Sequence, residues 1–154
     1  METLLNVLVG TWFICSTNFP MWTKGNKTNP AFNYTIIVKN DGSKILGDNV
    51  GYLKNGKSRS IKGFDHPDKK DSTAFIWRGK GLLGLLKSRW RVALLDPAHN
   101  WAVIYFSKTA FTPEGVDIIS RRQSLSKETI EQVKLQMLKD TVLKTHVASL
   151  KNLY

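Results

Sequence analysis

Eight short runs of alternating or continuous apolar residues, separated by turn residues, dominate the sequence up to Arg122. Such a series is typical of an all-β sandwich or barrel. Asp41-Gly42 and Asn55-Gly56 predict tight hairpin turns, because glycine accepts the positive φ that these turns require. Every link is short enough for antiparallel neighbours, so we expect an up-and-down meander. The runs are Gly10–Asn18, Asn33–Asn40, Ile45–Leu53, Ser58–Phe64, Thr73–Gly79, Ser88–Leu95, Trp101–Lys108 and Gly115–Arg122.

The hydrophobic period changes after the eighth run. Ile130, Val133 and Met137 recur at three- to four-residue spacing among Lys, Glu and Gln, which predicts one amphipathic helix over about residues 126–141. Ser126 is a natural N-cap for it. The tail over residues 143–154 is compatible with a short strand or with a frayed helix end. Because the first and seventh runs are apolar on both faces, they need an outer cover. We expect the helix to pack outside the sheet across these two strands and the eighth.

Length and composition bound the domain organisation and the compartment. With 154 residues and 42% hydrophobic content, the chain has material for one core, so we predict a single domain over residues 1–154. Its only cysteine, Cys15, rules out an intramolecular disulfide and mildly favours a reducing compartment. The first ten residues lack a basic leader and a cleavage site, so they read as mature protein. We expect a cytoplasmic or membrane-peripheral protein; secretion after removal of a signal peptide is the alternative.

The net charge of +11 raises the question of a nucleic-acid partner. Lys and Arg occur in ones and twos along the whole chain, with no basic helix, finger or aromatic and glycine-rich RNA-binding motif. The sequence therefore argues against nucleic acid as the partner, whereas attraction to acidic surfaces in general remains compatible with it.

Several motifs along the chain together resemble the lipocalin family, most closely its bacterial and plant-type members. The resemblance implies an all-β fold: an eight-stranded antiparallel up-and-down barrel with one C-terminal α-helix packed on its outside. The usual motif near the sixth turn is replaced here by residues 97–101, so recognition of that end by a receptor is doubtful. The matching motifs are Gly10-Thr11-Trp12, Tyr34-Thr35, Ile61-Lys62-Gly63, Leu95-Asp96, Trp101-Ala102-Val103 and Ile119-Ser120-Arg121.

The resemblance also assigns a structural role to three residues. In the family pattern, Trp12 follows Gly10 and closes the bottom of the barrel, and an arginine before the helix lies against the indole. By position that arginine is Arg121, with Arg122 as the alternative. A guanidinium over an indole gains cation–π energy of about 0.5 to 2 kcal/mol.

The cytosolic fatty-acid-binding proteins are the nearest rival family, since they also open with Gly-Thr-Trp. They place two helices between the first and second strands and end on a strand. In this chain the corresponding segment, residues 19–32, carries two prolines and two asparagines and is a poor helix, and the convincing helix is C-terminal. We therefore favour the lipocalin interpretation.

The barrel interior is the expected binding site for a small hydrophobic ligand. Barrels of eight strands either fill with side chains or enclose one small ligand, and the sequence leaves both open. A charged inward group could hold a polar head, but strand parity does not identify one. The candidate wall residues are Tyr34, Ile36, Val38, Phe75, Trp77, Trp90, Val92, Leu94, Val103 and Tyr105.

The loops at the expected cavity mouth are unusually apolar and are flanked by lysines. Exposed apolar surface costs about 25 cal/mol per Å², so these loops either fold inward as a lid or dock on an anionic membrane, where each nearby lysine adds about 1 kcal/mol. The apolar mouth residues are Phe19, Met21, Trp22, Leu82, Leu83, Leu85, Leu86 and Phe111.

Catalytic motifs are not evident. Cys15 lies in a strand that is apolar on both faces, which favours an inert buried thiol. The three histidines, His66, His99 and His146, lack metal-ligand spacing. We expect a monomer without cofactor or metal that carries or sequesters a fatty acid, lysolipid, sterol or similar molecule. The alternatives are an enzyme acting on an apolar molecule on the same barrel, an intracellular fatty-acid-binding-protein-like carrier, and an interaction module with a filled barrel.

Overall fold

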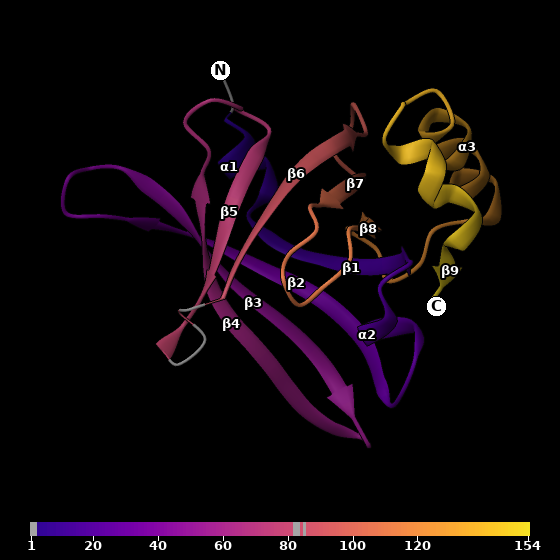
Figure 1. Ribbon diagram of the computed structural model, residues 1–154, viewed down its shortest axis with the longest axis horizontal. Helices are drawn as coiled ribbons and strands as arrows, with labels where there is room; N and C mark the ends of the chain where they lie inside the picture. Colours follow the sequence, from indigo (N-terminus) through magenta and orange to yellow (C-terminus); the bar gives the residue numbers. More distant parts are fainter. Residues whose placement is uncertain (1–2, 82–83, 85) are drawn as a thin grey trace.

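The computed structural model describes residues 3–81, 84 and 86–154. Within them, nine strands form one sheet in the order β2-β3-β4-β5-β6-β7-β8-β1-β9, and β1 also pairs with β2 (Figure 1). The pairing closes the eight long strands into an antiparallel up-and-down barrel, as predicted. The strands are β1 (Gly10–Thr17), β2 (Lys27–Val38), β3 (Lys44–Lys54), β4 (Lys57–Pro67), β5 (Ala74–Gly79), β6 (Lys87–Leu95), β7 (Trp101–Phe106), β8 (Gly115–Ser120) and β9 (Lys151–Asn152).

The predicted hairpin turns have the backbone geometry that their sequences require. Asn55 and Gly56, between β3 and β4, have φ of 52° and 76°. Positive φ at both central residues is the signature of a type I′ turn, whose twist matches that of the flanking strands. Gly42, between β2 and β3, has φ of 85°. Local turn chemistry therefore sets the register of the β2–β3–β4 hairpins.

In the part of the chain that the structure describes, the helical elements beside the barrel include α1 (Leu4–Leu8), α2 (Pro20–Thr23), α3 (Lys127–Met137) and the 3₁₀ helix η2 (Leu143–Ser149). Ser126 caps α3 by accepting a hydrogen bond from the backbone N–H of Thr129 at 3.1 Å. The helix is shorter than the predicted 126–141. Asp140 accepts hydrogen bonds from the N–H groups of Val142 and Leu143 and so begins η2 instead.

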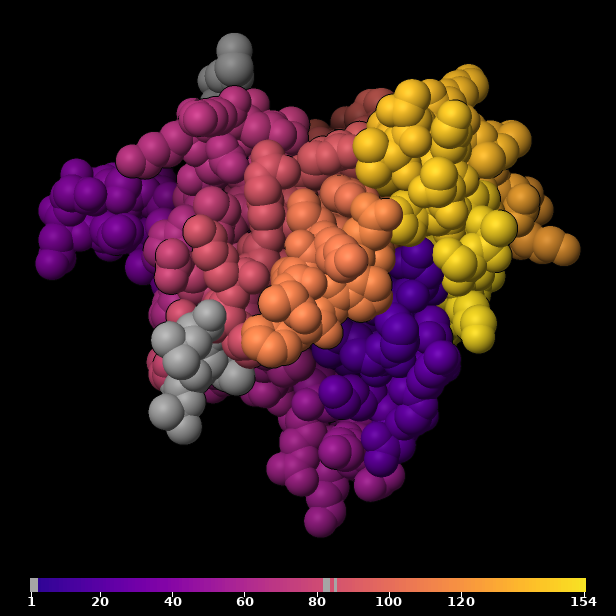
Figure 2. Space-filling model, in the orientation of Figure 1, coloured from indigo at the N-terminus to yellow at the C-terminus, as the bar shows by residue number. Residues whose placement is uncertain are grey.

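The C-terminal helix packs on the outside of the barrel, as predicted (Figure 1). Ile130, Val133 and Met137 of α3 form a second hydrophobic core with Val103 of β7 and Ile118 of β8. In the space-filling view the yellow C-terminal segment lies against the orange β7–β8 region (Figure 2). The helix thus covers β7 and β8, whose outer faces are apolar.

The cover of β1 differs from the expectation. The tail, not α3, lies along this strand: the N–H of Leu153 donates to the carbonyl of Cys15 at 2.8 Å, and β9 pairs with Ser16 and Thr17. The ring of Tyr154 lies edge-on to Phe13, with 6.4 Å between centroids. The expectation that the helix alone covers β1 left out this ninth strand, which hydrogen-bonds to β1 on the side away from β8.

Candidate functional site

The closed end of the barrel is built from the three residues that the family pattern assigned there. The guanidinium of Arg121 lies 3.8 Å from the centroid of the Trp12 ring and donates to the carbonyls of Val7 at 2.6 Å and Thr11 at 3.1 Å. Gly10 has φ of +104°, and a Cβ there would lie 3.0 Å from the guanidinium. Trp12 also donates to the carbonyl of Leu8 at 2.9 Å. The chain itself therefore satisfies the polar groups of this end.

The barrel interior holds six of the ten predicted wall residues. These six pack in the inner core and are Tyr34, Ile36, Phe75, Trp77, Trp90 and Val92. The other four predictions were wrong in their orientation. Val38 is 62% exposed at the end of β2. Leu94, Val103 and Tyr105 belong to the outer core beneath α3.

Two physical causes explain the reversed residues. A β-bulge between Val92 and Leu94 shifts the register of β6 against β7, so Leu94 leaves the inward parity. On β7 the inward residues are Ala102, Ile104 and Phe106. Because both faces of this strand are buried, its apolar pattern carries no information about which parity faces inward.

Stacked aromatic rings from four strands fill the centre of the interior. The Trp90 ring lies 4.7 Å from Phe75 and 5.9 Å from Tyr34, both stacked, and Tyr34 stacks on Phe32 at 5.6 Å. Phe106 lies 6.2 Å from Trp90. These flat faces offer an apolar, aromatic environment to a bound molecule.

Three aspartates that the strand patterns did not reveal point into the same interior. Asp48 on β3 is cross-strand partner to Tyr34, Asp65 on β4 is partner to Leu46, and Asp117 on β8 is partner to Ile104. All three are buried, with exposures of 6%, 0% and 1%. The indole N–H of Trp90 donates to Asp65 Oδ1 at 2.8 Å. An acid inside an apolar strand, such as Asp117 between Val116 and Ile118, is the signal that could have found them.

Burial controls the protonation of these acids. It raises the pKa of Asp117 to about 7, against a hydrogen bond from Thr17, and that of Asp65 to about 6, against hydrogen bonds from Asp48 and Trp90. Burial, followed by the charge of Asp65, raises the pKa of Asp48 well above its ordinary range. Burial and the charges of the three acids also raise the pKa of Tyr34. The interior therefore holds exchangeable protons near neutral pH.

The mouth loops divide between the two poses that the sequence left open. Phe19 packs edge-on against Phe106 at 5.3 Å, and buried Trp22 packs against Tyr52 at 5.5 Å, so both fold inward over the aromatic interior. Met21, Leu86 and Phe111 are exposed, Phe111 by 82%. Leu82, Leu83 and Leu85 lie outside the described residues. A surface pocket of about 280 Å³ beside Tyr52 is lined by Lys54, Asn55, Lys57 and Arg59.

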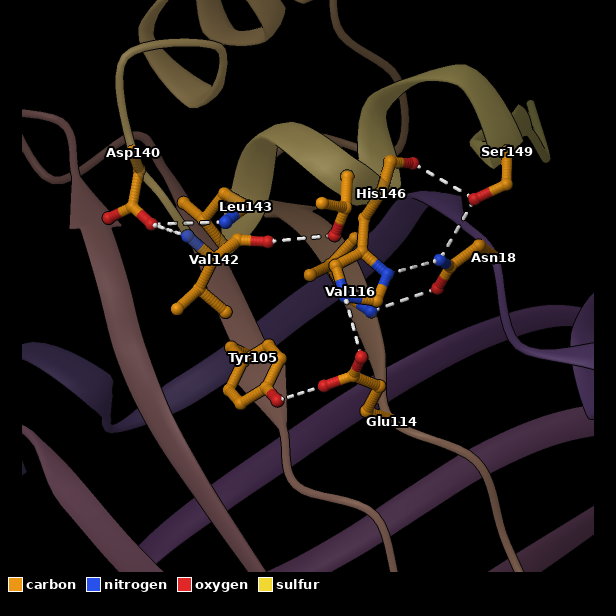
Figure 3. Close-up of polar contacts among 10 residues, drawn as sticks. Asn18, Tyr105, Glu114, Val116, Asp140, Val142, Leu143, His146 and Ser149 are labelled. Carbon is orange, nitrogen blue, oxygen red and sulfur yellow. Dashed lines mark hydrogen bonds and ion pairs between the residues drawn. The ribbon is translucent and has the colours of Figure 1, made fainter.

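A polar network connects the mouth to the C-terminal segment (Figure 3). Glu114 accepts a hydrogen bond from the Tyr105 hydroxyl, and its other oxygen lies 3.8 Å from His146 Nε2. The Asn18 amide lies 2.9 Å from His146 Nδ1 and donates to Ser149 at 3.1 Å. The network holds η2 against the β7–β8 loop.

Cys15 faces outward, away from the aromatic interior. Its thiol lies within 3.5 to 3.8 Å of the carbonyls of Gln123, Phe13 and Arg122, and burial raises its pKa to about 11. A protonated thiol is a poor nucleophile. Between Cys15 and Ile130 of α3 lies a surface pocket of about 330 Å³. The enzymatic alternative therefore gains no nucleophile at this position.

Neither a metal-binding cluster nor a membrane-spanning helix occurs over the described ranges. In residues 3–81, 84 and 86–154, no group of three or more His, Cys, Asp or Glu side chains is arranged to hold a metal ion. Within the same ranges, none of the helices has the length and apolar character needed to cross a membrane.

Solved structures share this architecture over nearly the whole chain. Apocrustacyanins C2 and C1 each match 96% of this chain and 77% of their own, with a TM-score of 0.69 and 11% identity. Per a 4, a major allergen from cockroaches, matches 99% of this chain and 92% of its own, with a TM-score of 0.68 and 12% identity. The siderocalin Ex-FABP matches 96% and 93%, with a TM-score of 0.67 and 12% identity.

The chain has the lipocalin fold. No family model matches the sequence, and no curated protein matches it significantly. The narrower likeness to bacterial and plant-type lipocalins stays a prediction. The lipocalin barrel closes over stacked aromatic rings and three buried acids, and its mouth carries an inward-folded lid of Phe19 and Trp22. Chemically, the interior combines aromatic ring faces with carboxyl groups that can donate or accept hydrogen bonds.

Proposed function

We propose that this lipocalin binds a small, mainly apolar molecule in its barrel and carries or sequesters it, acting as a monomer without a cofactor. A lysolipid, sterol, fatty acid or similar compound has the right apolar body. The observation that carries the proposal is the aromatic interior, in which rings from four strands pack against one another: Phe32 and Tyr34 on β2, Phe75 on β5, Trp90 on β6 and Phe106 on β7.

The mouth gives the ligand a route. Phe19 and Trp22 pack on the upper edge of the interior through single aromatic contacts with Phe106 and Tyr52, and displacement of these two rings opens the barrel. The siderocalin Ex-FABP, which is similar in fold, functions through dual ligand specificities. That description supports a ligand-binding use of the present barrel.

Binding is tested with a neutral apolar probe. Native mass spectrometry of freshly purified protein is followed by titration with N-phenyl-1-naphthylamine while tryptophan fluorescence is recorded. We expect saturable one-to-one quenching, because Trp90 stands at the centre of the site. Quenching is expected to weaken about tenfold in Trp90→Leu, whereas Trp101→Leu, on the outer core, serves as the control. A clean apo mass without quenching would mean a filled barrel and would refute the proposal.

Exchange of the ligand at an anionic membrane is the second part of the proposal. Phe111, Met21 and Leu86 are exposed at the mouth, beside lysines such as Lys24 and Lys108. An exposed aromatic ring inserted among anionic headgroups is favoured by burial and by the nearby cations.

Vesicle sedimentation tests the membrane step. The protein is expected to pellet with phosphatidylserine vesicles but less with neutral ones, and Phe111→Ser is expected to lower the bound fraction severalfold. Val38→Ser is the matched control, because Val38 is also exposed but lies at the β2–β3 turn, at the opposite end of the barrel. Equal loss in both variants, or no binding by the unmodified protein, would overturn this step.

A further inference from the structure

Although the chain is strongly basic, several of its few acidic side chains are buried in the barrel. The chain has 23 Lys and Arg and only 12 Asp and Glu. Three of those twelve acids, Asp48, Asp65 and Asp117, are nevertheless buried inside the barrel. Within the described ranges, the ion pairs all lie elsewhere, at Asp68, Asp71, Glu114 and Glu131. The undescribed residues are Met1, Glu2 and three leucines, none with a basic side chain.

The buried carboxyls also keep unused hydrogen-bonding capacity. Outside the contact of Asp48 with Asp65, three of their oxygens have no partner among the residues that the structure describes: Asp48 Oδ1, Asp65 Oδ2 and Asp117 Oδ1. Trp90 holds Asp65 by its other oxygen, so Oδ2 remains for the contact with Asp48 or for a ligand. A buried acceptor without a partner lowers the stability of the fold. A core built only for packing gains nothing from three of them.

The surrounding rings favour one kind of partner for these oxygens. Tyr34 is cross-strand partner to Asp48, and the indole that bonds Asp65 stacks on Tyr34 and Phe75. Carboxylates beside aromatic faces complement an organic cation, because the ammonium group gains ion pairs, hydrogen bonds and cation–π attraction together. The three acids do not form a metal-binding group among the described residues, and a carboxylate head would be repelled by them.

We propose that the interior of the barrel is a binding site for an organic ammonium ion with an apolar, flat body, in which Asp65 and Asp117 are the counter-ions and Tyr34 and Trp90 the ring walls. Asp48 shares the charge through its contact with Asp65. This inference rests on the proposed function and names the head group of its ligand.

The titratable groups that face the site come from four strands. They are Tyr34 on β2, Asp48 and the partly buried Tyr52 on β3, Asp65 on β4 and Asp117 on β8. The inward positions of the other four strands carry Trp12, Ile14 and Thr17 on β1, Phe75 and Trp77 on β5, Trp90 and Val92 on β6, and Ala102, Ile104 and Phe106 on β7. A bound ammonium ion displaces protons from the acids, so its affinity increases with pH until they are ionised.

Three probes of nearly equal shape test the inference by isothermal titration calorimetry: 2-(1-naphthyl)ethylamine, 2-(1-naphthyl)ethanol and 1-naphthylacetate. We expect the amine to bind about tenfold or more tighter than the alcohol at about pH 8, and the carboxylate to bind weakest. Amine affinity should fall about tenfold between about pH 8 and about pH 5. The net charge of +11 repels the amine and attracts the carboxylate, so unspecific electrostatic attraction to the protein surface would give the opposite order.

Single substitutions test which aspartates bind the amine. Asp117→Asn and Asp65→Asn should each weaken amine binding about tenfold while alcohol binding stays within about twofold. Glu128→Gln removes one charge from the exposed start of α3 and should change neither. The probe series on the unmodified protein needs no variant, so a misfolded variant does not end the test.

The outcomes separate the two proposals. If N-phenyl-1-naphthylamine binds but the amine is no tighter than the alcohol, the barrel takes apolar ligands and the ammonium site is refuted. If amine binding survives both aspartate substitutions unchanged, the counter-ion assignment is refuted. If no probe binds at all, the proposed function fails together with the inference.

Discussion

At the closed end of the barrel, Arg121 donates to two backbone carbonyls and lies over Trp12, whereas in the interior Asp65 and Asp117 each keep one buried oxygen without a partner in the described chain. Both regions set ionisable side chains against the core, and they differ in what provides the hydrogen-bond partner or the opposite charge. At the closed end the fold supplies it from its own atoms. In the interior it leaves the place to protons or, on our proposal, to a ligand.

The difference separates a structural device from a binding device. A buried group that is fully satisfied adds stability and fixes one geometry. Groups left unsatisfied lower stability, and their cost is recovered when something binds. Substitutions at the closed end should therefore destabilise the fold. Substitutions among the acids should stabilise the empty barrel and lower its affinity for a cationic ligand.

The largest effect is expected from Trp12→Ala at the closed end. The substitution removes a completely buried ring, its hydrogen bond to Leu8 and the seat of Arg121. We expect a loss of about 3 to 5 kcal/mol in the free energy of unfolding, measured by urea denaturation. Phe111→Ala, at an 82% exposed aromatic position, is the control and should change stability by less than about 0.5 kcal/mol. Comparable losses in the two variants would show that Trp12 does not close the barrel.

Asp117→Asn should have the opposite sign. Since the folded pKa of Asp117 is about 7, against an ordinary value of 3.8, the folded state holds this proton more tightly than the unfolded state does. The stability that protonated Asp117 gives to the folded state is fully present below about pH 4 and is lost as the pH rises through about 7. The variant lacks this pH dependence, so at about pH 8 its free energy of unfolding should exceed that of the unmodified protein by roughly 2 to 4 kcal/mol.

A partly exposed aspartate, Asp140, provides the contrast for that experiment. Asp140 accepts hydrogen bonds from the N–H groups of Leu143 and Val142. These bonds lower its pKa, and the bond from Leu143 has the larger effect. Its stabilisation is present above its unfolded pKa and is lost as pH falls, so Asp140→Asn should lower stability slightly at neutral pH. The free energy of unfolding is measured for both variants at several pH values. If it changes with pH in the same way in the two variants, the assignment of Asp117 as a buried, protonated acid is contradicted.

The same contrast explains what the sequence could predict. Strand positions and the helix were recoverable because turn dipeptides and periodicity are local signals, and the Gly10, Trp12 and Arg121 arrangement was recoverable from a family pattern. The sequence could not predict which side chains of β7 point inward, because Val103 and Ile104 are equally apolar and lie on opposite faces of the strand. On β6 the bulge sends Leu94 outward. Such shifts depend on pairing with a neighbouring strand, which a single sequence does not record.

The acids were missed for a related reason. Asp is uncommon in strands, so Asp48, Asp65 and Asp117 each carry a signal, but an aspartate on an edge or outward position gives the same one. Only closure of the barrel brings β3, β4 and β8 around Tyr34. The property that matters, an oxygen without a partner, belongs to the assembled interior rather than to any one strand.

The smallest effect is expected at the network between the mouth and η2, which lies between the two extremes: half-exposed Glu114 contacts both Tyr105 and His146 there. Burial first, and then the hydrogen bond and charge of Glu114, raise the pKa of Tyr105 to about 12. Glu114→Gln should lower that pKa in an ultraviolet difference titration and reduce stability by about 0.5 to 1.5 kcal/mol. Glu128→Gln is the control and should leave the tyrosine titration unchanged. An unaltered tyrosine titration in Glu114→Gln would mean that the contact does not persist in solution, and the outer network would then join the acids as a region whose polar groups the fold leaves unpaired.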